Sequence, residues 1–175
     1  MPVSIPELKV NPSGAEAASD VFLSVQTKRA GKIKGEGTTE GHTDEITVFS
    51  WGWGISANTA IGTTERTARR VYKHLVITKG IDTASTGLLS ALATNDEIKE
   101  ARLTMRKAGG DALDYFTMTL NSARVVSVDI DVGGDGRPFE RITIAFTKIG
   151  IEYQRQQGGG IGSGAFSFND EVLVG

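Results

Sequence analysis

Apolar residues recur at every second position in much of this chain, which is the pattern of β-strands. The clearest run is 138–152, where Ile142, Ile144 and Phe146 alternate with polar or small residues. A period of two is typical of a strand that buries one face. Comparable runs predict further strands at about 21–27, 46–57, 71–79, 97–107, 112–121 and 124–131. Many strands at this spacing favour a closed barrel or closed sandwich, because an open sheet would leave sticky edges.

Residues 44–54 lead from a polar loop into a strand rich in β-forming residues, with Phe49, Trp51 and Trp53 at alternate positions. Alternate residues share one face of a strand, and Ile55 continues that face. We therefore expect both tryptophans to pack at a sheet surface or at a seam between subunits. The alternative is an exposed pair that stacks on a sugar ring.

One helix is predicted within 82–95, where Asp82 can cap the start and Asn95 can end it. Its apolar residues are spaced three and four apart, as in an amphipathic helix: Ala84, Leu88, Leu89, Leu92 and Ala93. The glycine-rich segments 109–111 and 133–136 predict hairpin turns. The chain therefore predicts a meander of antiparallel strands with a single inserted helix.

The segments between and beyond the strands divide the chain into three parts. A length of 175 residues suits one domain. We expect 1–19, which is rich in proline, to be an extended N-terminal arm, 20–157 to be a β-barrel domain, and 158–175 to be a flexible glycine-rich tail. The tail ends in aromatic and aliphatic residues that could dock onto a neighbour. The polar connection 28–45 is unusually long, and such loops usually serve function or interaction.

Composition narrows the classes of partner. The 19 Lys and Arg residues nearly balance the 21 Asp and Glu residues, so nothing indicates nucleic acid or an anionic membrane as a partner. No apolar run approaches the ~20 residues of a membrane-spanning helix. The first ten residues carry two prolines and two charges, unlike a cleavable signal peptide. We expect the protein to fold in the cytoplasm, and any export to use machinery that reads no such signal.

Candidate chemistry is sparse, and we predict no enzyme activity, no cofactor and no metal. The chain has no cysteine and two histidines, His42 and His74, too few for a typical zinc site. His42 is expected to pack within its exposed loop, and His74 within a strand. The segment 129–136 lacks the ligands of a calcium loop, and 160–165 lacks the strand and helix of a dinucleotide site. A pair of carboxylates that meets only in space stays open.

Several fragments, in order along the chain, carry a resemblance to a known family. They are 20–25 (DVFLSV), 33–36 (IKGE), His42 before 45–46 (EI), 50–52 (SWG), 75–79 (LVITK), 82–85 (DTAS) and 138–140 (PFE), ahead of a final apolar strand ending near Tyr153. Each fragment is weak alone, but their order and spacing are specific. The sequence resembles the haemolysin-coregulated protein family, the tube subunits of bacterial type VI secretion systems.

The resemblance implies a mechanical role. Family members form six-membered rings that stack into a hollow tube, which a contractile sheath drives out of the cell beneath a spike protein. The tube carries small effector proteins in its lumen. By this resemblance the chain would be a barrel that assembles with itself, is built in the cytoplasm and is then secreted. We expect the contacts within and between rings to involve Lys34, Glu36, His42, Asp44, Ser50 and Trp51.

Two other functions stay open from the residues alone. The first is a carbohydrate-binding β-sandwich module that uses Trp51 and Trp53. The second is a glycoside hydrolase that depends on two carboxylates, for which Asp129, Asp131 and Asp135 are the candidates.

Overall fold

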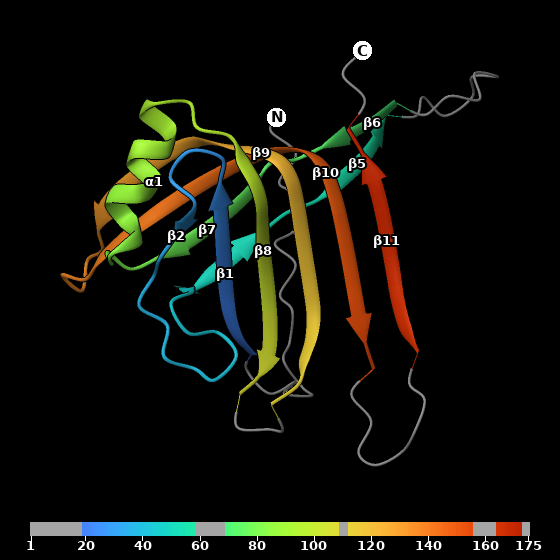
Figure 1. The fold of residues 1–175 in the computed structure, drawn as a ribbon, viewed down its shortest axis with the longest axis horizontal. Coiled ribbons are helices and arrows are strands. Elements are labelled where there is room, and N and C mark those ends of the chain that lie inside the picture. Colours follow the sequence, from blue (N-terminus) through green and yellow to red (C-terminus); the bar gives the residue numbers. More distant parts are fainter. Residues whose placement is uncertain (1–18, 59–68, 109–111, 156–163, 173–175) are drawn as a thin grey trace, which may run out of the picture.

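The chain folds as a mainly β structure with a single α-helix in a computed structural model that describes residues 19–58, 69–108, 112–155 and 164–172 (Figure 1). In chain order the elements are β1 (Ser19–Thr27), β2 (Lys32–Ile33), β3 (Ile46–Val48), β4 (Ser50–Gly52), β5 (Ile55–Asn58), β6 (Arg69–Tyr72), β7 (Leu75–Lys79), α1 (Ala84–Ala93), β8 (Ile98–Lys107), β9 (Asp114–Val132), β10 (Pro138–Gln154) and β11 (Ala165–Glu171). The mainly β prediction with one helix is confirmed.

The long hairpin of β9 and β10 joins two parts of one sheet. The first part of β9 pairs with β8, while β10 pairs at 140–144 with β7 and at 148–154 with β11. The hydrogen-bonded order is β2-β1-β8-β9-β10-β7-β4, and each pair of neighbours is antiparallel. In Figure 1 both long strands bend near their middle, so that the β7 part turns away from the β8 and β11 part.

Several predicted strands have different limits in the structure. The predicted strand 46–57 is three strands, because β3 pairs with β1, β4 with β7, and β5 with β6. The predicted strand 71–79 is likewise β6 and β7. The predicted strands 112–121 and 124–131 are instead the single strand β9. Ser122 has a φ of 47° there, so the bend is made inside the strand without ending it.

The expected closed barrel stays a prediction. Within the described residues the order of paired strands runs from β2 to β4 and does not return to its start. The short pair of β5 and β6 forms a separate two-stranded sheet. What is confirmed is an antiparallel β fold with one helix.

The core lies between the bent sheet and α1. Buried residues from β1, β3, β7, α1, β8, β9 and β10 form most of it: Leu23, Val25, Ile46, Leu75, Ile77, Leu88, Ile98, Leu103, Met118, Leu120, Ile142 and Ile144. Asp82 accepts a hydrogen bond from the Ala84 amide at 2.9 Å, and Asn95, just after the helix, has a φ of 52°. The N-cap residue is Thr83 and the C-cap residue is Thr94, so each end of α1 lies one residue inside the predicted Asp82 and Asn95.

The predictions for the two ends of the chain and for the two glycine-rich turns have different outcomes. Residues 1–18 lie outside the described part, as does the predicted turn 109–111. The turn at 133–136 is confirmed, because the Gly133 amide donates to the Arg137 carbonyl at 3.0 Å. The expected flexible tail is wrong for 165–171, which form β11 against β10. Phe166 and Phe168 alternate with polar residues, and this period of two suits an added edge strand.

Candidate functional site: an assembly surface

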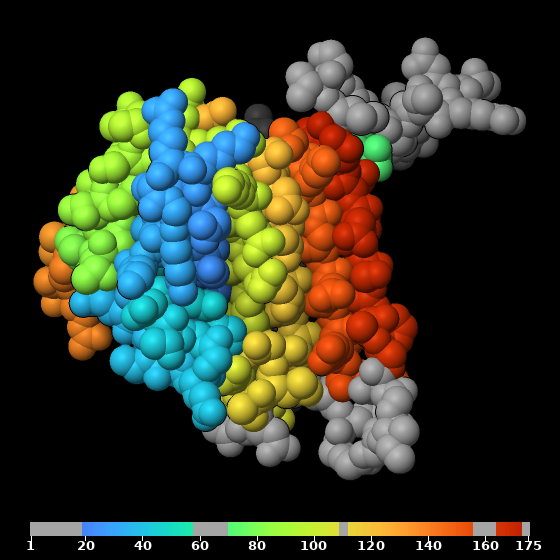
Figure 2. All heavy atoms as spheres, viewed as in Figure 1, coloured from blue at the N-terminus to red at the C-terminus, as the bar shows by residue number. Residues whose placement is uncertain are grey.

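The segment 28–45 is long but fixed to the body of the protein. Two amides donate across it, from Gly35 to the Asp44 carbonyl and from Gly37 to the Glu45 carbonyl, both at 2.9 Å. A Cβ on Gly35 would lie 2.5 Å from the Glu45 carbonyl oxygen, and one on Gly37 would lie 2.7 Å from it. Only glycine allows these backbones to approach so closely. Figure 2 shows this segment packed on the front of the molecule.

His42 contacts a residue of β1, the residue before β3 and the first residue of β9, and so attaches this segment to the sheet. Its side chain is buried, and its ring stacks on Phe22 of β1 at a centroid distance of 4.2 Å. Nδ1 lies 2.7 Å from a carboxylate oxygen of Glu45, which precedes β3. Nε2 lies 3.0 Å and 3.1 Å from the two carboxylate oxygens of Asp114, at the start of β9. The loop-packing interpretation of His42 is confirmed, but the ring is not exposed.

Arg106 completes this cluster from β8. Its Nε donates to Asp114 at 2.8 Å, and another guanidinium nitrogen donates to the Glu40 carbonyl at 2.9 Å. Burial acts to raise the pKa of Asp114, but hydrogen bonds from His42 and Arg106 outweigh it and leave that pKa lowered. Asp114 is therefore a carboxylate held between two donors. We call His42, Glu45, Arg106 and Asp114 the loop cluster.

Sequence reasoning found His42 but missed Asp114 and Arg106. They lie more than sixty residues further along the chain than His42, so only the pairing of β8 with β9 reveals their contact. The described residues contain no group of three His, Asp or Glu side chains that could hold a metal ion. His42 meets its two carboxylates on opposite sides of the ring, and this geometry suits hydrogen bonding rather than coordination.

The six expected interface residues do not all face solvent. Lys34 and Glu36 are exposed on the 28–45 segment, and Asp44 is half-buried there with a φ of 61°. Ser50 is exposed on β4. Lys34, Glu36 and Ser50 are therefore open to solvent, whereas His42 lies beneath the surface.

Both tryptophans pack against the core from positions that are partly buried. Trp51 lies 5.7 Å from the Phe116 ring centroid, and Trp53 lies 6.3 Å from that of Phe146. The expected packing is therefore confirmed. Phe49 is 66% exposed, however, because it lies between β3 and β4 and leaves the shared face. A shallow groove of about 650 Å³ runs beside Trp53, lined also by Gly52, Tyr72, Lys73, His74, Val76 and Thr143.

A second cluster of charges ties α1 to the sheet. Lys79 of β7 and Glu140 of β10 are fully buried and form an ion pair. Lys79 also lies 2.8 Å from Asp82, and the Ser85 hydroxyl donates to Glu140 at 2.8 Å. We call Lys79, Asp82, Ser85 and Glu140 the helix cluster. All four stand in fragments that carry the sequence resemblance, yet sequence analysis assigned a role to Asp82 alone, as the start of the helix.

One end of the sheet exposes aromatic residues. Tyr153 of β10 and Phe166 of β11 have ring centroids 6.5 Å apart, and they are 42% and 64% exposed. Phe168 of β11 is 43% exposed. Asp170 of β11 forms an ion pair with Arg70 of β6 at 2.6 Å and accepts from the Tyr72 hydroxyl. We call Tyr153, Phe166 and Phe168 the aromatic end.

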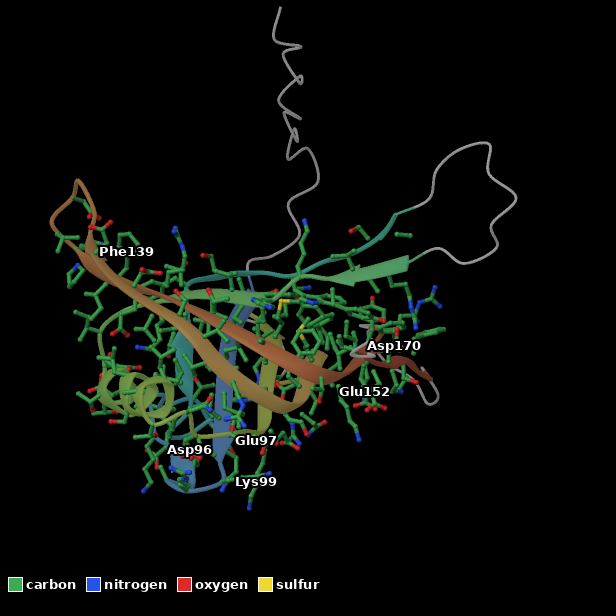
Figure 3. All side chains as sticks on the ribbon, turned by 90° about the horizontal axis from the view of Figure 1, so that it is seen from above. Asp96, Glu97, Lys99, Phe139, Glu152 and Asp170 are labelled. Atoms are coloured by element: carbon green, nitrogen blue, oxygen red, sulfur yellow. The ribbon has the colours of Figure 1, made fainter. Side chains whose placement is uncertain are left out.

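The hydrogen bonds at Asp170 perturb both partners. The hydrogen bond to Asp170 raises the pKa of Tyr72, and the same bond lowers the pKa of Asp170. Figure 3 places Asp170 and Glu152 at one end of the molecule and Phe139, at the tip of the β9–β10 hairpin, at the other. The described residues include no helix long and apolar enough to cross a membrane.

Comparison with known proteins identifies the family. The family described as "Type VI secretion system effector, Hcp" matches residues 22–153. Protein hcp1 of Pseudomonas aeruginosa is 32% identical over 151 residues, which cover 84% of this chain and 90% of that protein.

Two solved structures share the fold. A type VI secretion system effector from Yersinia pestis has a TM-score of 0.70 and 27% identity, covering 87% of this chain and 100% of the other. Hcp1 from Salmonella typhimurium has a TM-score of 0.70 and 26% identity, covering 88% and 95%. Neither the carbohydrate-binding module nor the glycoside hydrolase finds support among these relatives. The chain belongs to the Hcp family, and it is a tube subunit of a type VI secretion system.

Proposed function

We propose that this subunit closes its strands into a barrel and assembles head to tail into a six-membered ring, and that rings stack into a tube. The tube is expelled from the cell by a contractile sheath beneath a spike protein, and small effector proteins travel in its lumen. The work of the subunit is mechanical, so no catalysis, cofactor, nucleic acid or membrane insertion takes part. Family membership and the aromatic end support this proposal.

Barrel closure is supported by the path of β3 and β4. These strands are separated only by Phe49, yet β3 pairs with β1 and β4 pairs with β7. The Phe49 amide also donates to the Thr78 carbonyl of β7 at 2.8 Å. One continuous segment therefore contacts strands from both parts of the bent sheet, where it covers edges that would otherwise be open.

The aromatic end is the observation that carries the proposed ring. Isolated apolar residues are common on protein surfaces, but adjacent exposed aromatics on an edge strand form a patch that favours association. A contact between this end and a different surface of the next copy is heterologous, and heterologous contacts generate rings when the rotation closes. We place the neighbour's contribution on the 28–45 segment and β4, with exposed Lys34, Glu36 and Ser50 and half-buried Asp44 and Trp51.

The test replaces Phe166 and Phe168 with Ser in one variant and measures its sedimentation beside the parent chain. We expect the parent to sediment as a ring and the variant as smaller species with little change in melting temperature, since neither side chain belongs to the buried core. Val132→Ser is the matched control, because Val132 is 61% exposed at the tip of the β9–β10 hairpin, the end that carries Phe139 (Figure 3).

The outcomes separate the parts of the proposal. A parent that sediments as a monomer contradicts the ring itself. A parent ring that survives in the Phe166 and Phe168 variant contradicts the placement of the contact at the aromatic end. Dissociation in the Val132→Ser control as well would show that any lost apolar residue weakens the ring.

A further inference from the structure

Both ring nitrogens of His42 face carboxylates. Nδ1 lies 2.7 Å from Glu45, and Nε2 lies 3.0 Å from Asp114. A carboxylate only accepts hydrogen bonds, and a neutral imidazole has one N–H and one bare lone pair. A neutral ring would satisfy one of these contacts and turn a lone pair toward the other carboxylate. The doubly protonated ring satisfies both.

From this geometry we infer that His42 is a doubly protonated positioning residue, and that its charge holds the 34–45 segment against β1, β8 and β9. Loss of one proton removes one donor and leaves two carboxylates beside a single cation, Arg106. The segment then loosens, while the β8–β9 pairing, which does not depend on His42, keeps its hydrogen bonds. The attachment is present while the ring holds both protons, and it is lost when a rise in pH removes one of them.

The groups that contact or surround His42 come from the segment itself and from the strands to which it attaches. Glu45 belongs to the same segment, Asp114 comes from β9, Arg106 comes from β8, and the ring stacks on Phe22 of β1 with an interplanar angle of 6°. The lowered pKa of Asp114 keeps its carboxylate charged in mildly acidic solution. Charge-assisted hydrogen bonds are roughly twice as strong as neutral ones, so protonation of the ring strengthens the attachment of the segment, to which the Arg106 bond to the Glu40 carbonyl also contributes.

A consequence for assembly rests on the proposed function. If the 34–45 segment contacts the next copy, then raising the pH should weaken the ring as well as loosen the segment. The two effects are separable, because segment attachment is a property of the single chain and ring mass is a property of the assembly.

The test is amide hydrogen exchange at about pH 5.5 and about pH 8.5, on either side of the ordinary histidine titration, after correction for the intrinsic rate. We expect protection of the Gly35, Gly37 and Asp44 amides to fall about tenfold relative to β8 and β9 at the higher pH, the factor a charge-assisted hydrogen bond carries. The 15N shifts of the His42 side chain should show two protonated nitrogens at the lower pH.

Two variants make the result specific. In His42→Gln one amide group can donate to only one of the carboxylates, so the same amides should be weakly protected at both pH values. His74→Ala is the matched control, because His74 is exposed and forms no ion pair in the described structure, and it should keep the full pH response of the parent.

Equal protection of the segment at both pH values in the parent overturns the inference. A His42 ring with one bare nitrogen at the lower pH overturns it too. If protection follows pH while the ring mass stays constant, the role of His42 stands and the proposed contact through 34–45 fails. If the parent is a monomer whose segment still responds to pH, the ring fails and the role of His42 stands.

Discussion

The helix cluster and the loop cluster have similar parts but different surroundings. Lys79 and Glu140 are both fully buried where α1 meets the sheet. In the loop cluster the ring of His42 is buried, but the side chains of Glu45 and Asp114 keep 16% and 35% of their surface exposed. Water can replace part of what the loop cluster loses, but it cannot reach the Lys79–Glu140 pair of the helix cluster. The helix cluster therefore stabilises the fold, and the loop cluster sets the position of one surface segment.

The helix cluster should show the largest effect. Lys79→Met keeps the length of the side chain but leaves Glu140 buried with the Ser85 hydroxyl as its remaining partner. Breaking one partner of a buried pair costs about 3–5 kcal/mol, so the free energy of unfolding in urea should fall by that amount. The double variant Lys79→Met, Glu140→Leu should recover most of the loss, because it removes both charges. A loss under about 1 kcal/mol in the single variant would place this pair in contact with water.

The loop cluster should show a smaller and more local effect. His42→Ala removes two contacts to carboxylates and a stacked ring, and we expect a loss of about 1–3 kcal/mol in urea unfolding. His74→Ala should stay within about 0.5 kcal/mol of the parent, as an exposed substitution does. A loss for His42→Ala as large as that for Lys79→Met would remove the contrast between the clusters.

Protonation of the Asp114 carboxylate in acid should weaken the contacts of the loop cluster. Because its pKa in the folded protein is lowered, its contribution is present above the ordinary aspartate value of about 3.9 and is lost as the pH falls through the folded value. Protection of the 34–45 amides should therefore decline in acid, and Asp114→Asn should lower the protection and remove that decline. An acid decline that persists in Asp114→Asn would assign it to another carboxylate.

The smallest effect is expected at Asp170. Its ion pair with Arg70 is partly solvated, since half of the Arg70 side chain surface is exposed. Such pairs contribute about 0–1 kcal/mol, so Asp170→Asn should leave urea unfolding nearly unchanged. Its effect should be confined to the attachment of β6 to β11, which amide exchange at β6 would report. A loss above about 2 kcal/mol would make this contact part of the core.

Local patterns predicted what depends on neighbours in the sequence. The alternation in β10, the position of α1 between Asp82 and Asn95, and the turn at 133–136 all follow from such patterns. The bend in β9 could not be predicted, because it depends on the different partners that its two parts find. The strand β11 was missed because the glycines before it suggested a flexible tail, although Phe166 and Phe168 already showed a period of two.

In the candidate site, too, local sequence identifies some residues, and only the fold reveals their partners. His42 could be singled out in the sequence, but its carboxylate partner Asp114 lies 72 positions away and its aromatic partner is on β1. Lys79 and Glu140 are 61 positions apart, and a charged residue in a strand pattern ordinarily predicts an exposed position. Burial of that pair is a property of the assembled fold.

Native mass spectrometry of the parent chain tests the central claim most directly. The account predicts a discrete species of six copies of the 18.6 kDa chain, which is the proposed ring, held together through the exposed aromatic end. Because ring formation depends on concentration, the measurement belongs at about 20 μM or above. A monomer under those conditions would contradict the account.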